Sequence, residues 1–301
     1  MKKIRIGYFA DGPWSHKAFE KIIKDNSIEV VFIVPRIDTS DNTLKDYSER
    51  YKIDYLFPIK INSKEFIELA KSYNCDLFVS MSFNQIFKER VIKIPKYNTI
   101  NCHAGKLPFY RGRNVLNWAL INDEKEFGIT VHFVDEGIDT GDIILQNTYP
   151  ISENDTYKTL LEVAHIECAY TLFSAIKRIQ SNNYTRVSQK SIHPVGFYCG
   201  QRIVGDEVID WNQTSRKVYN FIRAVCEPGP KAHTYCGSNL VKVNSASLIP
   251  NAPVYIGKVG QIVGKTERGF IVKTQDSTVE IFEIDSAVKL KVGDCLRDYK
   301  I

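Results

Sequence analysis

The sequence predicts an α/β fold with two domains, the first built on a mostly parallel sheet and the second smaller, β-rich and barrel-like. Over roughly the first 150 residues, short apolar β-branched runs alternate with segments of helical periodicity, as in strands joined by crossover helices. Over roughly the last 50 residues, short strand-like runs are separated by glycines, which is typical of a small barrel or meander.

In the first domain, strands and helices are expected to alternate along the chain. The predicted strands are 4–10, 28–34, 75–81, 98–102, 128–134 and 141–146. The predicted helices are 15–24, 63–72, 85–94, 113–121 and 155–181. Ser63 and Asp155 stand where N-terminal caps are needed, and residues 36–52 are expected to form a loop. In such sheets ligands bind beyond the carboxyl ends of the strands.

The composition of the chain changes after about Tyr184, where Gly, Pro, Asn and Ser interrupt short segments. We therefore expect a catalytic domain over 1–190, a linker over about 190–205 and a β-rich domain over 205–301. The second domain is expected to hold one helix within 211–224. Its predicted strands are 257–264, 269–273 and 278–284.

Composition and charge exclude several classes of protein. The net charge of +5 is mildly basic and no run of five Lys or Arg occurs, so the chain fits an anionic small molecule such as a nucleotide or folate better than nucleic acid. No apolar run approaches the roughly 20 residues that span a bilayer, and the N-terminus resembles a buried strand more than a signal peptide. We expect no membrane association.

The seven cysteines are scattered without a C-x-x-C pair, which favours a reducing cytoplasm over a disulfide framework. Cys226, His233 and Cys236 are the nearest approach to a metal cluster, and their spacing matches no standard zinc pattern. No metal is therefore expected.

The residues that indicate chemistry are Asn101, His103 and Asp139. Asn101 and His103 lie two positions apart near a strand end, so their side chains leave the same face. An amide can stabilise an oxyanion, an imidazole can move a proton and a carboxylate can orient that imidazole, which together suit acyl transfer. Taken singly, each residue has a plain alternative: a lone histidine is more often structural, and Asp139 lies in a glycine-flanked turn.

Residues 11–16 follow the first strand and are expected to form a loop. This segment lacks the G-x-G-x-x-G pattern of dinucleotide binding, so hydride transfer is disfavoured. Trp14 is equally compatible with stacking on a ligand ring and with simple packing. His16 and His132 are expected to be surface or sheet residues rather than catalysts.

Residues 101–142 resemble the formyltransferases that use N10-formyltetrahydrofolate. The shared pattern is Asn101-x-His103, then Leu107-Pro108 with Arg111-Gly112, then Asp139-Thr-Gly141. The stretches 208–211, 222–224 and 228–235 resemble the opening of that family's second domain. The resemblance implies a Rossmann-like catalytic domain.

Within that family the chain most resembles the nucleotide-sugar N-formyltransferases. Residues 111–118 look like their Arg-Gly-Arg-x-x-x-Asn-Trp form, and residues 11–14 look like their Asp-Gly-Pro-Trp start. The chain departs from many members at Ala104-Gly-Lys106, where Gly-Ser-Leu or Pro-Ser-Leu is common. The departure removes a serine hydroxyl and offers the Lys106 ammonium group as a phosphate contact in its place.

The resemblance implies specific roles. Asn101 would stabilise the oxyanion, His103 would relay the amine proton to the leaving folate nitrogen, and Asp139 would hold His103. The folate would lie against the backbone of Gln85, Ile86 and Phe87. Arg113 and a second loop would complete the folate site; the residues of that loop are Asp135, Glu136, Gly137 and Ile138. The substrate-binding candidates are Trp14, Lys106, Tyr110 and Arg202.

The function implied is transfer of a formyl group from N10-formyltetrahydrofolate to the amine of a nucleotide-linked amino sugar, for a surface polysaccharide such as lipopolysaccharide. The enzyme is expected to be a cytoplasmic homodimer. A methionyl-tRNA formyltransferase is the alternative, although a basic stripe for tRNA is lacking. A glycinamide formyltransferase would leave about a hundred residues unexplained. A non-catalytic binding protein would not need Asn101, His103 and Asp139 together.

Overall fold

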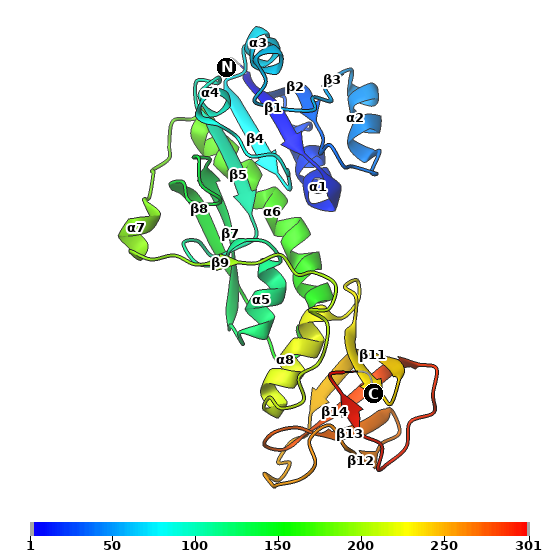
Figure 1. Ribbon diagram of the computed structural model, residues 1–301. Coiled ribbons are helices and arrows are strands. Elements are labelled where there is room, and N and C mark those ends of the chain that lie inside the picture. Colours follow the sequence, from blue (N-terminus) through cyan, green and yellow to red (C-terminus); the bar gives the residue numbers. More distant parts are fainter. Residues whose placement is uncertain (1–2, 300–301) are drawn as a thin grey trace. The chain divides into compact units, whose positions relative to one another are not determined.

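The structure is a computed structural model that describes residues 3–299, and it separates the chain into two units (Figure 1). Unit 1 comprises Met1–Arg113, Phe127–Tyr149 and Glu162–Cys199. Unit 2 comprises Asn114–Glu126, Pro150–Leu161 and Gly200–Ile301. The chain passes between the units more than once, for the last time between Cys199 and Gly200.

Unit 1 contains a seven-stranded sheet of order β3-β2-β1-β4-β5-β7-β8. The strands are β1 (Ile4–Ala10), β2 (Ile28–Val34), β3 (Asp54–Tyr55), β4 (Leu77–Met81), β5 (Thr99–His103), β7 (Glu126–Phe133) and β8 (Ile143–Pro150). The pairs from β3 to β5 are parallel, whereas β5 and β7 are antiparallel. The predicted α/β class is confirmed. The short strand β3 was not predicted.

Helix α1 (Gly12–Ile22) corrects the prediction that residues 11–16 form a loop. Asp11 is its N-cap, with extended backbone angles and a side chain that accepts a hydrogen bond from the amide of Gly12. Pro13 lies in the first turn, where a missing N–H costs nothing. The Gly-Pro pair looks like a turn in the sequence, but here it starts the helix.

Two further predictions about helices in unit 1 were wrong. Residues 36–52 are not all loop, because helix α2 (Thr43–Tyr51) lies within them and Tyr47 stacks on Phe19 of α1. The helix predicted over 85–94 is only the single turn α4 (Glu89–Ile92). Its N-terminal part is held in an irregular path because the Asn62 side chain bonds the carbonyl of Ile86 and the amide of Lys88.

Helix α3 (Lys64–Ser72) begins as predicted, with the Ser63 hydroxyl accepting from the amide of Phe66. Helix α6 (Tyr157–Gln180) also forms, but the predicted cap is corrected. Asp155 bonds the amide of Ser152 and the hydroxyl of Thr159, whereas the Thr156 hydroxyl oxygen accepts from the amide of Thr159. Thr156 is therefore the residue in the capping position.

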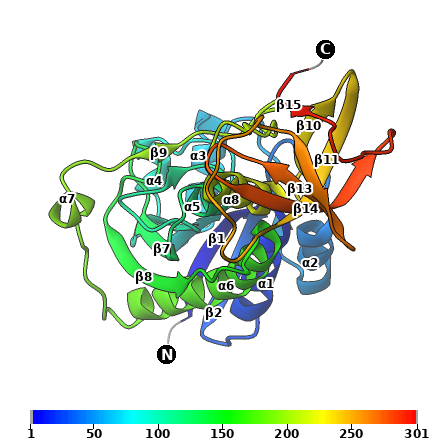
Figure 2. The same ribbon diagram turned by 90° about the horizontal axis from the view of Figure 1, so that it is seen from below.

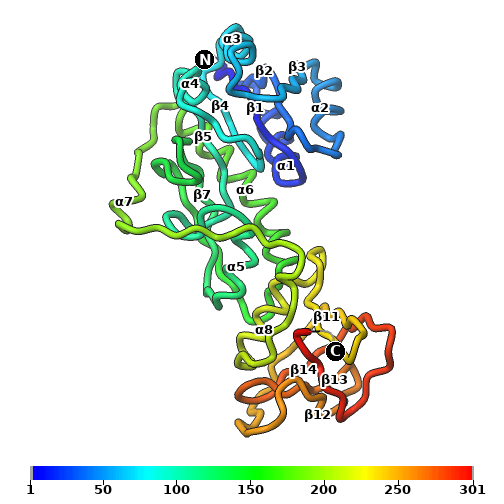
Figure 3. Tube along the Cα trace, viewed as in Figure 1, coloured from blue at the N-terminus to red at the C-terminus, as the bar shows by residue number. Residues whose placement is uncertain are grey.

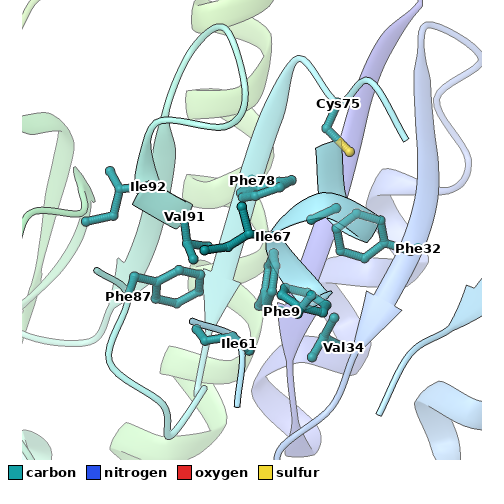
Figure 4. Close-up of a cluster of buried hydrophobic side chains, with 12 residues drawn as sticks. Phe9, Phe32, Val34, Ile61, Ile67, Cys75, Phe78, Phe87, Val91 and Ile92 are labelled. Carbon is teal, nitrogen blue, oxygen red and sulfur yellow. The ribbon is translucent and has the colours of Figure 1, made fainter. Parts of the chain in front are cut away.

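Side chains on one face of the sheet form an aromatic-rich core under α3 and α4 (Figure 4). Phe9 lies at its centre and makes edge contacts with several other phenylalanine rings, namely Phe32, Phe66, Phe78, Phe83 and Phe87. Helices α1 and α6 cover the opposite face (Figure 2). There the buried Cys102 thiol faces the Cys168 carbonyl at 3.7 Å.

Helix α6 is long and apolar enough to span a membrane by length and composition alone. One side of it is nevertheless buried in unit 1; the buried residues of that stretch are Ala164, Cys168, Ala169, Leu172, Ala175, Ile176 and Ile179. We therefore interpret α6 as a core helix.

Unit 2 holds a six-stranded antiparallel sheet of order β12-β13-β14-β11-β10-β15. Its strands are β10 (Ala232–Cys236), β11 (Asn239–Leu248), β12 (Ile262–Lys265), β13 (Gly269–Lys273), β14 (Thr278–Ser286) and β15 (Leu296–Arg297). The predicted β-rich second part is confirmed, although β10, β11 and β15 were not predicted.

Helices α5 (Val115–Ile121) and α8 (Ser215–Val225) belong to unit 2. They are joined by a hydrogen bond of 2.6 Å from the Asn117 amide group to the carbonyl of Ala224. The predicted helix over 211–224 begins later than expected, because Thr214 caps it. Trp211 is instead buried, and its indole donates to the Thr234 hydroxyl.

Candidate active site

Strand β5 carries Asn101 and His103 near its carboxyl end, and the alternation of a strand places both side chains on one face. The neighbouring strand β7 lies antiparallel to it, with His132 directly opposite Asn101 and Thr130 opposite His103. The predicted pair is therefore adjacent to a second histidine that sequence reasoning assigned to the sheet alone.

Asp139 reaches this strand end from the turn between β7 and β8. Its backbone has φ +54°, in the left-handed region that Asp tolerates better than most residues. Asp135 stabilises the turn, since its carboxylate accepts from the amide of Gly137 at 3.1 Å and the hydroxyl of Thr140 at 2.5 Å. The turn brings a carboxylate that is 38 positions from Asn101 into contact with it.

The Asp139 carboxylate is shared among four partners. Its Oδ2 accepts a hydrogen bond of 2.9 Å from the amide of Gly112 and lies 3.6 Å from His103 Nδ1. Its Oδ1 lies 3.4 Å from both Asn101 Nδ2 and His132 Nε2. The structure thus brings the three predicted catalytic residues together around one carboxylate.

The pKa of Asp139 reflects two opposing effects. Burial raises it, but the charges of His103 and His132 and the Gly112 hydrogen bond outweigh burial, so the pKa is well below the usual value of an aspartate. The carboxylate therefore stays ionised across the physiological range and can orient an imidazole without taking its proton.

His103 is fixed through both ring nitrogens. Its Nε2 lies 2.7 Å from the carbonyl oxygen of Tyr110, and since a carbonyl only accepts, Nε2 carries a proton in this arrangement. Its Nδ1 faces Asp139, so the ring as placed is complementary to the protonated imidazole. Only Gly fits at 105, because a Cβ there would lie 2.4 Å from both His103 Nε2 and the Tyr110 carbonyl oxygen.

His132 lies in strand β7, in keeping with the expectation of a sheet residue, and its ring also contacts Asn101 and Asp139. It is 2 % exposed, and its Nδ1 donates to its neighbour's carbonyl, that of Phe133, at 2.8 Å. Its Nε2 lies 3.3 Å from Asn101 Nδ2 and 3.4 Å from Asp139 Oδ1. The place of His132 in the site follows from the register of β7 against β5, and no local pattern in the sequence reveals that register.

The candidate folate residues lie in two irregular segments of unit 1. The Gln85 side chain accepts from the amide of Ile61, and the Phe87 ring is buried in the aromatic core. The Ile86 side chain is exposed, and Gln85 is half-buried. The second segment is exposed throughout Asp135, Glu136, Gly137 and Ile138, and Arg113 is exposed as well.

The candidate substrate residues belong to different elements of the chain. Trp14 lies on α1 and makes an edge contact with His165 of α6, with ring centroids 4.6 Å apart. Tyr110 is buried, and its backbone carbonyl contacts His103. Arg202 belongs to unit 2, where it donates to the carbonyl of Asp206.

Lys106 follows Gly105 in the same loop, and its backbone lies against β7. A Cβ at Gly128 would be 2.7 Å from the Lys106 Cα, so a side chain at 128 would displace the loop. Within residues 3–299 the structure holds no group of three His, Cys, Asp or Glu side chains placed to bind a metal ion.

This geometry defines a class of enzyme. A mostly parallel sheet presents an amide, an imidazole and an ionised carboxylate at one strand end, which together can stabilise an oxyanion and relay a proton. These are the requirements of acyl transfer to an amine.

The chain belongs to the formyl transferase family. The Formyl transferase family matches residues 6–175, and the family described as Formyl transferase, C-terminal domain matches residues 204–296. The predicted recognition of this family is confirmed, and the protein is an N-formyltransferase.

Curated relatives and solved structures differ in their named substrates. Methionyl-tRNA formyltransferase of Pelotomaculum thermopropionicum is 32% identical over 84% of this chain and 80% of its own length. The Clostridioides difficile enzyme of that name is 31% identical over 92% of this chain and 91% of its own length.

Among solved structures, WlaRD, a sugar 3N-formyl transferase with dTDP and 5-N-formyl-THF, has a TM-score of 0.70 at 23% identity, covering 96% of this chain and 100% of its own. The N-formyltransferase of Helicobacter canadensis, in complex with folinic acid and dTDP-3-aminofucose, has a TM-score of 0.67 at 23% identity over 94% of this chain and 100% of its own. At this identity the likeness concerns the fold.

Proposed function

We propose that this enzyme transfers the formyl group of N10-formyltetrahydrofolate to the amine of a nucleotide-linked amino sugar, using Asn101, His103 and Asp139. The single observation that carries the chemistry is the shared Asp139 carboxylate, which lies within 3.6 Å of the His103 ring and 3.4 Å of the Asn101 amide. The choice of acceptor depends on separate observations about charge.

In the proposed reaction the amine nitrogen bonds to the formyl carbon as the carbonyl oxygen gains negative charge. Asn101 donates an N–H to that oxygen. Its present contacts at 3.3 and 3.4 Å are weak hydrogen bonds, so they can be exchanged for a stronger bond to an oxyanion. The donor is ready before the reaction begins, which is what makes such stabilisation effective.

His103 handles the proton. The attacking amine loses a proton as the new C–N bond forms, and the folate nitrogen gains one as the old C–N bond breaks. An imidazole held between Asp139 and the Tyr110 carbonyl can carry out this relay once one of its two contacts opens. Asp139 stays ionised because of its lowered pKa, and it keeps the ring in place.

We place the folate against two segments beside the site. The backbone over Gln85, Ile86 and Phe87 is irregular rather than helical, so its polar groups are not all used by a helix. The loop Asp135–Ile138 is exposed. The pKa of Asp38 is lowered, first by its hydrogen bonds with Arg36 and also by the positive charge of Arg113. A cation here suits the carboxylates of a folate tail.

Charge supports a small acceptor over tRNA. Residues 253–301 contain eight Lys or Arg and seven Asp or Glu, a net charge of 8 − 7 = +1. Several bases of unit 2 are paired with acids: Arg268 with Glu280, Lys231 with Glu227, and Arg216 with Asp123 and Glu153. A surface for tRNA would need an unneutralised basic stripe.

Methionyl-tRNA formylation is the second candidate. It is supported by the curated relatives at 31% and 32% identity, which carry that name and match most of this chain. Both acceptors present a primary amine, so Asn101, His103 and Asp139 would act in the same way on either. The acceptor must be identified by direct assay.

The test is a mass-spectrometric assay with N10-formyltetrahydrofolate and a panel of amino-deoxy nucleotide sugars, with methionyl-tRNA in parallel at low and high salt. We expect one formyl group on a sugar nucleotide, with a rate that changes little between 50 and 200 mM salt. Formylation of the tRNA alone, falling steeply with salt, would replace this proposal with the second candidate.

The setting of the reaction is also part of the proposal. We propose a cytoplasmic homodimer that supplies a formylated sugar for a surface polysaccharide such as lipopolysaccharide. The seven cysteines are all free, which suits a reducing compartment. Sedimentation at micromolar concentration should give about twice the 34.5 kDa mass of one chain, and a single species of 34.5 kDa would remove the dimer.

A further inference from the structure

Gln189 begins the short helix α7 (Gln189–Ile192), next to the segment that the sequence assigns to a linker. Figures 1 and 3 show this segment as a long excursion that leaves the end of α6, carries α7 and returns through β9 (Tyr198–Cys199). Most of the excursion is exposed, but Gln189 is only 3 % exposed. A buried amide in an exposed segment calls for a structural reason.

The Gln189 amide uses both of its ends. Its oxygen accepts from Arg111 Nε at 3.0 Å and Nη2 at 2.7 Å. Its nitrogen donates to the carbonyls of Asp139 and Gly141, each at 2.8 Å. The orientation of the amide is fixed by chemistry, because a guanidinium only donates and a carbonyl only accepts.

These four hydrogen bonds connect the two elements that place Asp139. Arg111 and Gly112 form strand β6, and the amide of Gly112 donates to the Asp139 carboxylate. On the other side, Gln189 holds the carbonyl of Asp139 itself and that of Gly141, two residues on. Gln189 therefore bridges both ends of the 2.9 Å bond between Gly112 and Asp139.

The rest of this segment packs against residues 108–112, which follow His103 in the chain. Strand β9 pairs in parallel with β6, so Tyr198 and Cys199 lie opposite Arg111 and Gly112. A Cβ at Gly196 would be 2.4 Å from the carbonyl oxygen of Pro108, so the backbone there lies directly on the loop that follows His103. The segment is a strap over the active-site loop.

We propose that Gln189 is a positioning residue for Asp139, and that the strap 188–199 is a working part of the active site. The proposal rests on the proposed catalytic role of Asp139. A displacement of about 1 Å in a catalytic group can reduce turnover a hundredfold. Loss of the Gln189 bridge should therefore lower kcat by roughly 10- to 100-fold, with KM for the folate changed little.

Three variants separate positioning from a general structural role. Gln189→Ala removes all four bonds. Gln189→Glu keeps a carboxylate for Arg111 but places negative charge against the carbonyls of Asp139 and Gly141. Gln180→Ala is the matched control, because Gln180 also bridges within unit 1, donating to the carbonyl of Ser27 at 2.9 Å and accepting from Lys177 at 2.8 Å.

A positioning role predicts that Q189A and Q189E both lose kcat, while Q180A keeps it. A role limited to anchoring the strap predicts instead that Q189E is rescued by its bond to Arg111, and that result would overturn the proposal. If Q189A fails to fold by circular dichroism, Q189E retains the Arg111 contact and carries the test.

A double-mutant cycle with Asp139→Asn completes the experiment. If Gln189 acts through Asp139, adding Q189A to D139N should lower kcat by less than twofold further. Full multiplication of the two losses would contradict the proposal. If D139N alone retained near-normal kcat, the proposed role of Asp139 would be wrong. If instead D139N lost kcat while Q189A kept it, only the proposed role of Gln189 would be wrong.

Discussion

Asn101 on β5 and His132 on β7 are paired on adjacent antiparallel strands, and the Asn101 amide nitrogen lies 3.3 Å from His132 Nε2. Because His132 Nδ1 donates to a backbone carbonyl, a neutral ring presents Nε2 as an acceptor for Asn101. A protonated ring would instead donate to Asp139. With the ring neutral, His132 therefore keeps the Asn101 amide turned with its nitrogen toward Asp139.

His132→Ala should therefore lower kcat by roughly 10-fold or more while leaving folate affinity nearly unchanged. The oxyanion donor loses the partner that orients it, whereas no folate candidate residue is altered. His132→Gln, which can still accept a hydrogen bond, should lose less. Steady-state kinetics with a folate binding titration would measure both effects.

His233→Ala is the control for that pair, because His233 is a partly buried sheet histidine in unit 2. It should leave kcat unchanged. Wild-type kcat in His132→Ala would show that Asn101 needs no orientation by this ring.

Gly105→Ala should reduce kcat by more than about 100-fold. Its Cβ would lie 2.4 Å from His103 Nε2 and from the Tyr110 carbonyl oxygen, so the contact that fixes the ring would be broken. Gly200→Ala is the matched control, since a Cβ there meets nothing within 4 Å. If the two variants were equally active, the His103–Tyr110 contact would have no catalytic importance.

The lowered pKa of Asp139 predicts a pH-dependent contribution to stability. Its folded pKa lies below the unfolded value of about 3.9, so the ionised carboxylate stabilises the fold above that pH, and the benefit is lost as pH falls through the folded pKa. Asp139→Asn should then cost roughly 1–3 kcal/mol at pH 7, and the cost should fall only at pH values well below about 3.9, as the folded pKa is approached. Urea unfolding at pH 7 and at about pH 2 measures the difference, and a constant cost at both values would contradict this account.

Lys273 should be important for stability but not for catalysis. It is fully buried in unit 2, and its ammonium group donates to the carbonyls of Thr274, Gln275 and Ser277 at 2.8 to 3.4 Å. Lys273→Met should cost roughly 2–3 kcal/mol, because three carbonyls lose a charged donor. Chemical denaturation would measure this, with kcat as the control. An unchanged free energy of unfolding would mean that the hydrogen bonds of Lys273 to these three carbonyls contribute nothing to stability.

Much of the fold could be predicted from the sequence, because buried strands such as 4–10 and 28–34 are short, mostly apolar runs, each with a single charged residue near its start. Helix boundaries were less predictable. Gly12 and Pro13 resemble a turn but start α1, and the backbone of 85–88 is held irregular by Asn62, a distant side chain. Tertiary hydrogen bonds of this kind leave no local pattern.

The same distinction applies to the site. Asn101, His103 and Asp139 could be predicted because motifs carry them, and the structure places them together. His132 and Gln189 could not be predicted in the same way. His132 depends on the register of β7 against β5, and Gln189 depends on how residues far along the chain return to the Arg111 loop.

The central claim is that Asn101, His103 and Asp139 act as one unit in formyl transfer, and single-turnover kinetics of Asp139→Asn test it most directly. The account predicts a formyl-transfer rate at least 100-fold below wild type, with folate binding retained and the fold intact at pH 7. A single-turnover rate within a few-fold of wild type would contradict it, because the carboxylate that joins the imidazole and the amide would then have no part in the chemistry.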